Sequence, residues 1–321
     1  MSAHAEALSA TELVRQSIEG RRLSPVDTLV AFTLLFTLLS SVVILITLLA
    51  DTIAAAMPVF QSRGLSFVTD SLSPSAEEAG IWQGIMGSLA LIGFVIVVAF
   101  PLGVAAAVYL EEYASDNRVT RFIGANIRNL AGVPSIVYGI LGLFLFVEIF
   151  MGGVFGAEGG IGGRNVIAGG LTLAVLVLPI MIITTAEALR AVPRGLRDAS
   201  LAVGATRWET IRHHILPVAF PAILTGSVLT IARAFGESAA LLLAGAQLSL
   251  YFSVANDASF VDLVSNQPYT ALPIIIYNFA RQPQAGFVSL TAAAIVVLLV
   301  MLLTVNAAAV LARDRFERRY R

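Results

Sequence analysis

The chain has 321 residues, of which 57% are hydrophobic and only 13% are charged, and its mean hydropathy is +0.86. Soluble globular domains contain about half apolar and about a quarter charged residues, so this composition excludes that class and indicates an all-α protein that crosses a membrane several times. The formal net charge of -1 says little about partners, whereas the absence of cysteine excludes disulfides, thiolate metal sites and a cysteine nucleophile.

Six apolar segments are each long enough to cross a bilayer core about 30 Å thick, which takes about 20 helical residues. In chain order they are Thr28–Ala50, Ile85–Leu110, Asn129–Val147, Val166–Ala186, Val218–Ala244 and Phe287–Leu311. The first is longer than the apolar core of a secretory signal, so we expect it to remain in the protein as a transmembrane helix. Leu272–Ala280 is too short to cross and predicts a re-entrant or outer-face half helix within the segment 246–286.

Arginine alone sets the orientation, because the chain contains no lysine and all 20 basic positions are arginine. Sixteen arginines fall in the termini and loops on one side of the six predicted spans, three fall on the other side, and Arg233 lies within a span. The positive-inside rule therefore predicts that both termini are cytoplasmic. The expected organisation is a cytoplasmic tail over residues 1–27, a transmembrane domain over 28–311 with a cytoplasmic loop at 187–217, and a second tail over 312–321.

Two patterns resemble binding motifs but lack what the chemistry requires. The glycine-rich run Gly152–Arg164 has no preceding strand, following helix start or Lys-Ser/Thr pair, so we interpret it as an outer loop rather than a phosphate cradle. His213 and His214 are adjacent, which on a helix directs them about 100° apart, and no third ligand accompanies them. We expect neither a metal site nor catalysis in this chain.

The loop 187–217 predicts two short helices joined by a sharp turn. Pro193 suits the first turn of the first helix and Leu196–Val203 continues it. Gly204 permits the change of direction, and Thr206 can cap a second helix over Arg207–Ile215. Pro217 is expected to end that helix and begin the next span. Such an element can dock in a groove of a soluble partner, or it can rest as an amphipathic helix among lipid headgroups.

The spacing within this loop resembles the EAA loop of ABC importer permeases. The matching positions are Asp198, Ala199, Ser200, Gly204, Leu216 and Pro217. The sequence departs from the family pattern at Asp198, where glutamate is usual, at Ser200, where alanine is usual, and at His214, where isoleucine is usual. The resemblance implies a coupling loop that inserts into a cleft of an ATP-hydrolysing subunit.

Arg233 and Glu237 lie four residues apart in the fifth predicted span, so on a continuous helix they would share one face and could form an ion pair. An ionised group near the bilayer centre costs on the order of 3 kcal/mol, so both must face protein or water. The pair is a candidate solute site, since an arginine partly neutralised by a carboxylate can bind an oxyanion and release it. A structural bridge between helices is the alternative.

Further motifs resemble the PstA-type permease subunits of phosphate-specific ABC transporters. They are the Ala-Gly-Val-Pro-Ser-Ile-Val-Tyr-Gly string from Ala131, the Arg-Ala-x-Gly-Glu string from Arg233, and the Ala-Leu-Pro and Tyr-Asn pairs at Ala271 and Tyr277. Within the first string, Pro134, Ser135 and Tyr138 either line the solute path or hold helices together.

The resemblance implies a type I ABC importer permease fold and a set of partners. These are a PstC-like permease, two copies of an ATPase that holds ATP and Mg, and an extracytoplasmic phosphate-binding protein, with no cofactor in this chain and no nucleic acid. Alternatives remain: an importer for sulfate or molybdate, the PstC-type subunit itself, a structural subunit of another membrane complex, or an ion-coupled secondary carrier in which Glu237 carries a proton.

Overall fold

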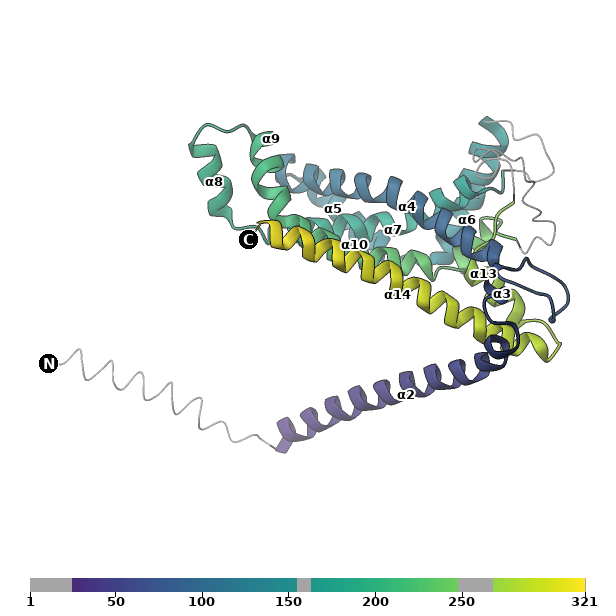
Figure 1. Ribbon diagram of the computed structural model, residues 1–321. Helices are drawn as coiled ribbons and strands as arrows, with labels where there is room; N and C mark the ends of the chain where they lie inside the picture. The colour runs from purple at the N-terminus through teal and green to yellow at the C-terminus, as the bar shows by residue number, and fades with distance from the viewer. Residues whose placement is uncertain (1–24, 155–162, 248–267, 321) are drawn as a thin grey trace. The chain divides into compact units, whose positions relative to one another are not determined.

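The computed structural model describes residues 25–154, 163–247 and 268–320, and throughout these ranges the chain forms helices and connecting turns without a strand (Figure 1). Contacts divide the chain into two units, Met1–Thr52 and Ile53–Arg321.

The described part of the first unit consists of the beginning of helix α2 (Pro25–Arg63). Proline at the first position and Asp27 in the first turn both favour a helix start. The apolar window of α2 has none of its residues buried in the protein, so its leucine and isoleucine side chains require lipid or another chain around them. The predicted span Thr28–Ala50 is thus part of a longer helix of 39 residues, about 58 Å long.

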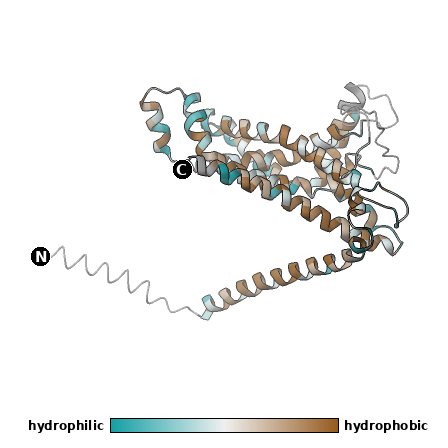
Figure 2. Cartoon of the chain, viewed as in Figure 1, coloured by the Kyte–Doolittle hydropathy of each residue, from teal (hydrophilic) through white to brown (hydrophobic). Residues whose placement is uncertain are grey.

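The second unit is built on four long apolar helices, which appear brown in Figure 2. They are α4 (Trp82–Val108), α7 (Val166–Arg190), α10 (Leu216–Phe235) and α14 (Gly286–Tyr320). Helix α7 is central, since it packs against both α4 and α10 and 67% of its apolar window is buried, against 22% for α14. Gly103 lets α4 approach α7 closely, because a Cβ there would lie 2.5 Å from Cγ of Met181. The second and fourth predicted spans are confirmed as α4 and α7.

The third predicted span, Asn129–Val147, contains a sharp bend near its start. Helix α5 (Arg118–Ala131) ends there, α6 (Ser135–Gly142) begins after a break, and the two limbs meet at an angle of 101°. The break has a local cause, because a residue that precedes proline disfavours the helical conformation and Pro134 lacks a backbone donor. Helix α6 continues as the π-helical segment η2 (Leu143–Val154).

The fifth predicted span, Val218–Ala244, differs from the structure at both ends. Pro217 does not separate two helices: α9 (Arg207–Thr210) runs through the π-helical segment η3 (Ile211–Ile215) into α10 as one helix of 29 residues. A π-helical turn leaves backbone carbonyl groups without their usual α-helical donors. Pro217, which has no N–H to donate, can therefore follow η3 without interrupting the helix. At the other end α10 stops at Phe235, and a separate short helix, α11 (Ala239–Leu243), follows.

The remaining elements cover the two ends of the bundle. Helix α14 continues to Tyr320, so it extends past the predicted end of the sixth span at Leu311, and the expected tail over 312–320 is helical. The short helix predicted at Leu272–Ala280 is confirmed as α13, which packs against α4 and α14. The other elements are α3 (Ser66–Thr69), the π-helical segment η1 (Tyr109–Tyr113) and α8 (Arg194–Ala202).

The Ser88 hydroxyl on α4 accepts the backbone N–H of Leu272 at 2.8 Å. This bond fixes the start of α13 to the first turns of α4. Helices α3 and α13 therefore lie at the end of the bundle opposite to α8 and α9 (Figure 1). Of the expected segment 246–286, residues 248–267 lie outside the described part.

Candidate functional site

Helices α8 and α9 form a hairpin that turns at Gly204. The backbone φ of Gly204 is +91°, a conformation that residues with a Cβ rarely adopt. A Cβ added there would meet no atom within 4 Å, so the glycine serves the backbone angle and not a close contact. The sharp change of direction predicted from the sequence is confirmed.

The second arm of the hairpin begins with a reciprocal cap. The Thr206 hydroxyl accepts the Glu209 backbone N–H at 3.2 Å, and the Glu209 carboxylate accepts the Thr206 backbone N–H at 2.8 Å. Two N–H groups that the helix leaves unpaired are thereby satisfied. The sequence prediction of Thr206 as the cap is confirmed.

A buried pair of hydroxyls closes the hairpin. The Oγ of Ser200 on α8 and the Oγ1 of Thr210 at the end of α9 lie 2.9 Å apart, and both residues are buried. Ser200 is one of the departures from the EAA pattern, and the alanine usual at this position could not make this bond. The departure thus supplies a specific contact between the two arms.

Two arginine–glutamate pairs lie where the hairpin meets the membrane-spanning helices: one joins α8 to η1 and the other joins the end of α7 to η1. Arg197 on α8 lies 2.9 Å from Glu112 in η1 and also donates to two carbonyl oxygens at the end of α7, those of Leu189 and Val192, each at 2.7 Å. Arg190, the last residue of α7, binds both carboxylate oxygens of the neighbouring Glu111 at 2.5 and 2.8 Å.

In the sequence these arginines indicated only the membrane orientation, and the two glutamates carried no prediction of their own. The signal that could have revealed the pairs is the adjacent Glu111 and Glu112 directly after an apolar span. Carboxylates at such a position require cationic partners, and the nearest concentration of arginine in the sequence is the loop 187–217.

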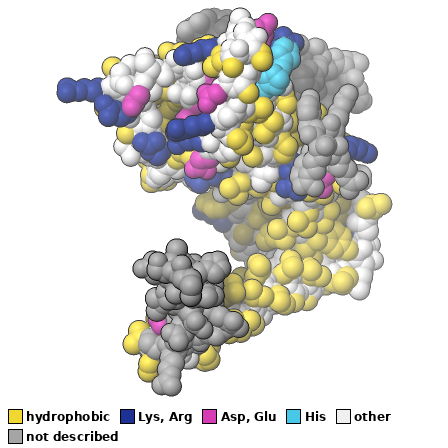
Figure 3. Space-filling model, turned by 90° about the vertical axis from the view of Figure 1, so that its left-hand side faces the viewer, with side chains coloured by type: hydrophobic (Ala, Val, Ile, Leu, Met, Phe, Trp, Pro, Cys, Tyr) yellow, Lys and Arg dark blue, Asp and Glu magenta, His cyan; other side chains and the backbone are white. Residues whose placement is uncertain are grey.

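The outward face of the hairpin is open in this chain. Asp198 and Ala199 are exposed, Val203 next to the turn retains 85% of its accessible surface, and Trp208 retains 53%. Figure 3 views this end of the protein, where arginine, acidic and hydrophobic side chains alternate over the surface. A large aliphatic side chain exposed at the tip of a rigid turn is typical of a surface that another protein covers.

The two remaining positions of the EAA pattern, Leu216 and Pro217, do not share this outward face. They lie in the first turn of α10 and are half buried, within the continuous helix. His213 and His214 on η3 are exposed, and no group of three potential metal ligands occurs among the residues that the structure describes. Most of the glycine-rich run Gly152–Arg164, namely residues 155–162, lies outside the described part.

The expected ion pair between Arg233 and Glu237 is absent from the described ion pairs, so this prediction is wrong. The reason is that α10 ends at Phe235 with Gly236 as its C-cap, which removes the helical spacing that would bring the two side chains together. The Glu237 carboxylate instead accepts the backbone N–H of Ala240 at 3.3 Å, at the start of α11. Arg233 is exposed in the last turn of α10.

The Pro-Ser-x-x-Tyr motif lies at the bend between α5 and α6. Pro134 is the N-cap of α6 and Ser135, half buried, is its first residue. The Tyr138 hydroxyl donates to the carbonyl of Leu130 at 2.8 Å, which ties α6 back to the end of α5 across the bend. These contacts support the helix-holding role of the motif.

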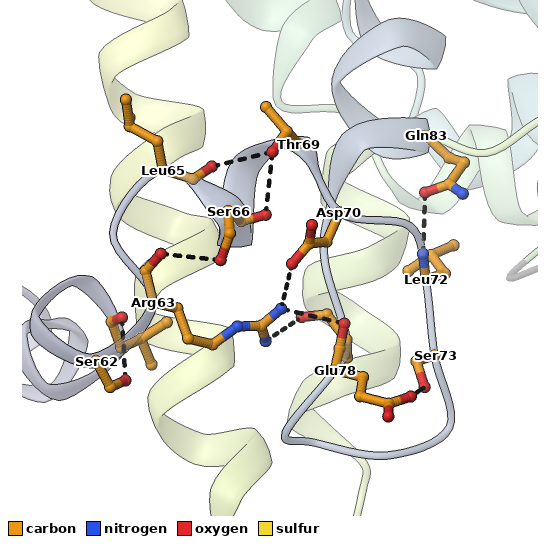
Figure 4. A network of polar contacts seen from close by, with 12 residues as sticks. Ser62, Arg63, Leu65, Ser66, Thr69, Asp70, Leu72, Ser73, Glu78 and Gln83 are labelled. Atoms are coloured by element: carbon orange, nitrogen blue, oxygen red, sulfur yellow. Dashed lines mark hydrogen bonds and ion pairs between the residues drawn. The ribbon is translucent and has the colours of Figure 1, made fainter.

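The opposite end of the second unit carries an arginine network that sequence reasoning missed (Figure 4). The Arg63 guanidinium donates to the Asp70 carboxylate at 2.9 Å and to the carbonyl oxygens of Ala79 and Glu78 at 2.8 and 3.1 Å. All three partners belong to the loop between α2 and α4. Arg63 therefore closes this loop on itself.

Comparison with known proteins identifies the chain's relatives. Residues 99–321 match the family described as "Binding-protein-dependent transport system inner membrane component". The phosphate transport system permease protein PstA 1 of Mycobacterium tuberculosis (strain ATCC 25618 / H37Rv) is 34% identical over 252 residues, which cover 77% of this chain and 74% of that protein. The PstA protein of Haemophilus influenzae is 31% identical over 249 residues, covering 75% and 79%.

Another relative has a higher sequence identity to this chain, but over a shorter aligned segment. The probable ABC transporter permease protein YqgI of Bacillus subtilis is 39% identical over 176 residues, so the match spans 55% of this chain and only 56% of YqgI. The match to YqgH of the same organism covers 61% of that protein at 36% identity.

Two solved structures share the fold. A bacterial alginate ABC transporter in complex with its periplasmic protein has a chain that superposes with a TM-score of 0.57 at 16% identity, covering 92% of this chain and 96% of that one. The inward-facing MetNI methionine ABC transporter gives 0.50 at 22% identity, covering 75% and 94%. With a family match over more than half of its length, the protein belongs to the binding-protein-dependent transport system inner membrane components and has the fold of a type I ABC importer permease.

Proposed function

We propose that this chain is the permease subunit of an ATP-driven importer that moves inorganic phosphate across the cytoplasmic membrane by alternating access. The observation that carries the proposal is the exposed α8–α9 hairpin, which the Arg197–Glu112 pair holds to the end of the transmembrane helices. Relatives named as phosphate transport permeases match about three quarters of the chain, which supports phosphate as the solute.

In this proposal the hairpin is the coupling surface for an ATPase subunit. Asp198, Ala199, Gly204 and the exposed Val203 form the contact, while Ser200 holds the hairpin's shape from within. ATP and Mg bind to two ATPase copies and not to this chain, which itself performs no chemistry. The hairpin then faces the cytoplasm, as do both termini, in agreement with the arginine distribution.

A second permease, similar to PstC, and an extracytoplasmic phosphate-binding protein complete the proposed importer. The exposure of Arg233 supports a position of the second permease next to the end of α10. A charged side chain in an apolar helix must face water or protein, and this chain does not cover Arg233. The solute path then runs along the interface between the two permeases, with Arg233 exposed to it. Glu237 lies beside the path at the start of α11.

The test is uptake of radiolabelled phosphate by the complete importer in proteoliposomes, with sulfate and molybdate as competitors. Arg233→Ala should lower uptake roughly ten- to hundredfold, because a hydrogen bond to a charged group is lost, while Arg233→Lys should retain part of it. Arg281→Ala, which removes an exposed arginine elsewhere, is the matched control.

Three outcomes would contradict parts of this proposal. Normal uptake by Arg233→Ala removes Arg233 from the solute path. Stronger competition by sulfate or molybdate than by unlabelled phosphate changes the solute. Uptake that proceeds without ATP and follows a proton gradient supports the alternative of an ion-coupled carrier in which Glu237 carries a proton.

A further inference from the structure

An apolar hollow lies beside the start of α10, between α4, α10 and α14. Its volume is about 310 Å³. The lining consists of Phe100 and Val104 from α4, Leu216, Pro217, Phe220 and Ile223 from α10, and Phe316 from α14. The rings of Phe220 and Phe316 meet edge to face with centroids 4.9 Å apart, so the hollow is bounded by aromatic and branched side chains. Such a lining offers nothing to recognise a polar ligand.

The hollow lies where the surface changes from apolar to charged. On the α10 side, Arg212 and His213 in η3 are exposed immediately before the apolar part of the helix begins. On the α14 side, Phe316 is flanked by Arg313 and Arg315. This change from apolar to charged residues marks the boundary between the hydrocarbon and headgroup layers of a membrane.

The charge next to the hollow is positive. The last ten residues contain five arginines against two acidic residues, Asp314 and Glu317. Arg313 is engaged by Asp314 at 2.9 Å and by the Thr225 hydroxyl at 3.5 Å. Arg315 is exposed, and among the described side chains it has no hydrogen-bond or ion-pair partner. Arg315, the neighbour in sequence of the lining residue Phe316, is therefore available to an anion from outside the chain.

We propose that the hollow binds an acyl chain of an anionic phospholipid whose phosphate is held by Arg315. The apolar lining accounts for the chain, and the net positive charge at the rim accounts for a preference for anionic over zwitterionic headgroups. The lipid lies against Leu216 and Phe220 in the first turns of α10, the helix that carries the coupling hairpin. It fills the space between α10 and its neighbours α4 and α14 and stabilises their packing.

Native mass spectrometry of the complete complex, released from nanodiscs of mixed phosphatidylglycerol and phosphatidylcholine, measures the lipids that remain bound. Arg315→Gln should lower the preference for phosphatidylglycerol about fivefold, because one arginine near the headgroup is lost. Val104→Phe fills the hollow and should reduce the retention of both lipids. The controls are Arg281→Gln and Val97→Phe, which change an exposed arginine and an exposed valine away from the hollow.

A photocrosslinking arm identifies the occupant directly. Phe316 is replaced by p-benzoylphenylalanine, which keeps an aromatic ring at the hollow. A phospholipid adduct supports the proposal, whereas an adduct to the partner permease or to another segment of this chain overturns it. Equal retention of phosphatidylglycerol by the parent, Arg315→Gln and Val104→Phe complexes also overturns it. Neither measurement depends on the identity of the transported solute.

Discussion

Arginine side chains secure both ends of the second unit, but they connect very different parts of the chain. At the hairpin end, Arg190 and Arg197 bind glutamates that are 79 and 85 residues away in sequence. At the other end, Arg63 binds groups only 7 to 16 residues away, all within one loop. The first arrangement joins α7 and α8 to the end of α4, whereas the second fixes the shape of a single connection.

The two networks also differ in how far water can replace a lost contact. The Glu112 side chain is only 11% exposed, while Asp70 is 45% exposed. Removal of the arginine therefore leaves Glu112 poorly solvated but allows Asp70 to be hydrated. We expect disruption at the hairpin end to affect coupling across the protein, and disruption at the Arg63 loop to remain local.

The largest effect is expected from Arg197→Ala. It removes the partner of a mostly buried glutamate and two bonds to the end of α7, at a cost of about 2–3 kcal/mol. Phosphate-stimulated ATP hydrolysis by the reconstituted importer should fall at least about tenfold, and the thermal unfolding temperature should drop. Arg194→Ala removes an exposed arginine from the same helix and serves as control. Equal ATP hydrolysis and unfolding temperatures in the two variants would show that the Arg197–Glu112 ion pair does not couple the hairpin to the transmembrane helices.

Gly204→Ala should have the next largest effect. The backbone angle at this residue costs a non-glycine residue about 1–2 kcal/mol, so the hairpin opens or shifts and binding of the ATPase subunit weakens by roughly five- to thirtyfold. Binding of the purified ATPase to the permease pair measures this directly. Gly195→Ala is the matched control, since it lies within α8 with open space around it and should stabilise that helix. If both substitutions act alike, the positive φ at Gly204 does not matter for docking.

Thr206→Ala tests the cap of the hairpin's second arm. Loss of an N-cap hydroxyl costs about 1 kcal/mol, so the first turn of α9 should fray. Hydrogen exchange at the backbone amides of residues 207–210 should accelerate by about fivefold, with a smaller loss of ATPase affinity than for Gly204→Ala. Thr206→Ser keeps the hydroxyl and should restore protection. Unchanged exchange in the alanine variant would mean that packing of η3 alone holds this turn.

The smallest and most local effect is expected from Arg63→Gln. Hydrogen exchange should increase for residues 64–81, because the three contacts of the guanidinium are lost, while ATPase binding stays at the parent level. Asp70→Asn should show a weaker form of the same change, since the bonds to the two carbonyl groups remain. An effect of Arg63→Gln on ATPase binding would contradict the distinction between a local and a long-range network.

The sequence was most informative where the local pattern alone determines the structure. Hydropathy located α4 and α7, the short apolar run gave α13 with its bounds, and Gly204 and Thr206 predicted the hairpin because turn and cap chemistry act over a few residues. The family resemblance, confirmed by the comparisons, came from the spacing of the Asp198, Gly204 and Pro217 positions.

It was least informative where helices break or meet. Hydropathy does not register an interruption inside an apolar run, so the stop after Phe235 and the bend before Pro134 were missed. The first error produced the wrong Arg233–Glu237 pair. Long-range ion pairs such as Arg197 with Glu112 depend on tertiary packing, which no local spacing reveals.

The continuity from α9 through η3 into α10 has a mechanical consequence. Arg207–Phe235 is one continuous helix about 40 Å long. A rotation of the hairpin is therefore transmitted along this helix to the turn that carries Arg233. Within this helix, η3 is the one segment with π-helical instead of α-helical geometry. If η3 changes to α-helical geometry, α10 rotates about its own axis relative to the hairpin. Arg233 then changes its direction around that axis without any large displacement of the helix.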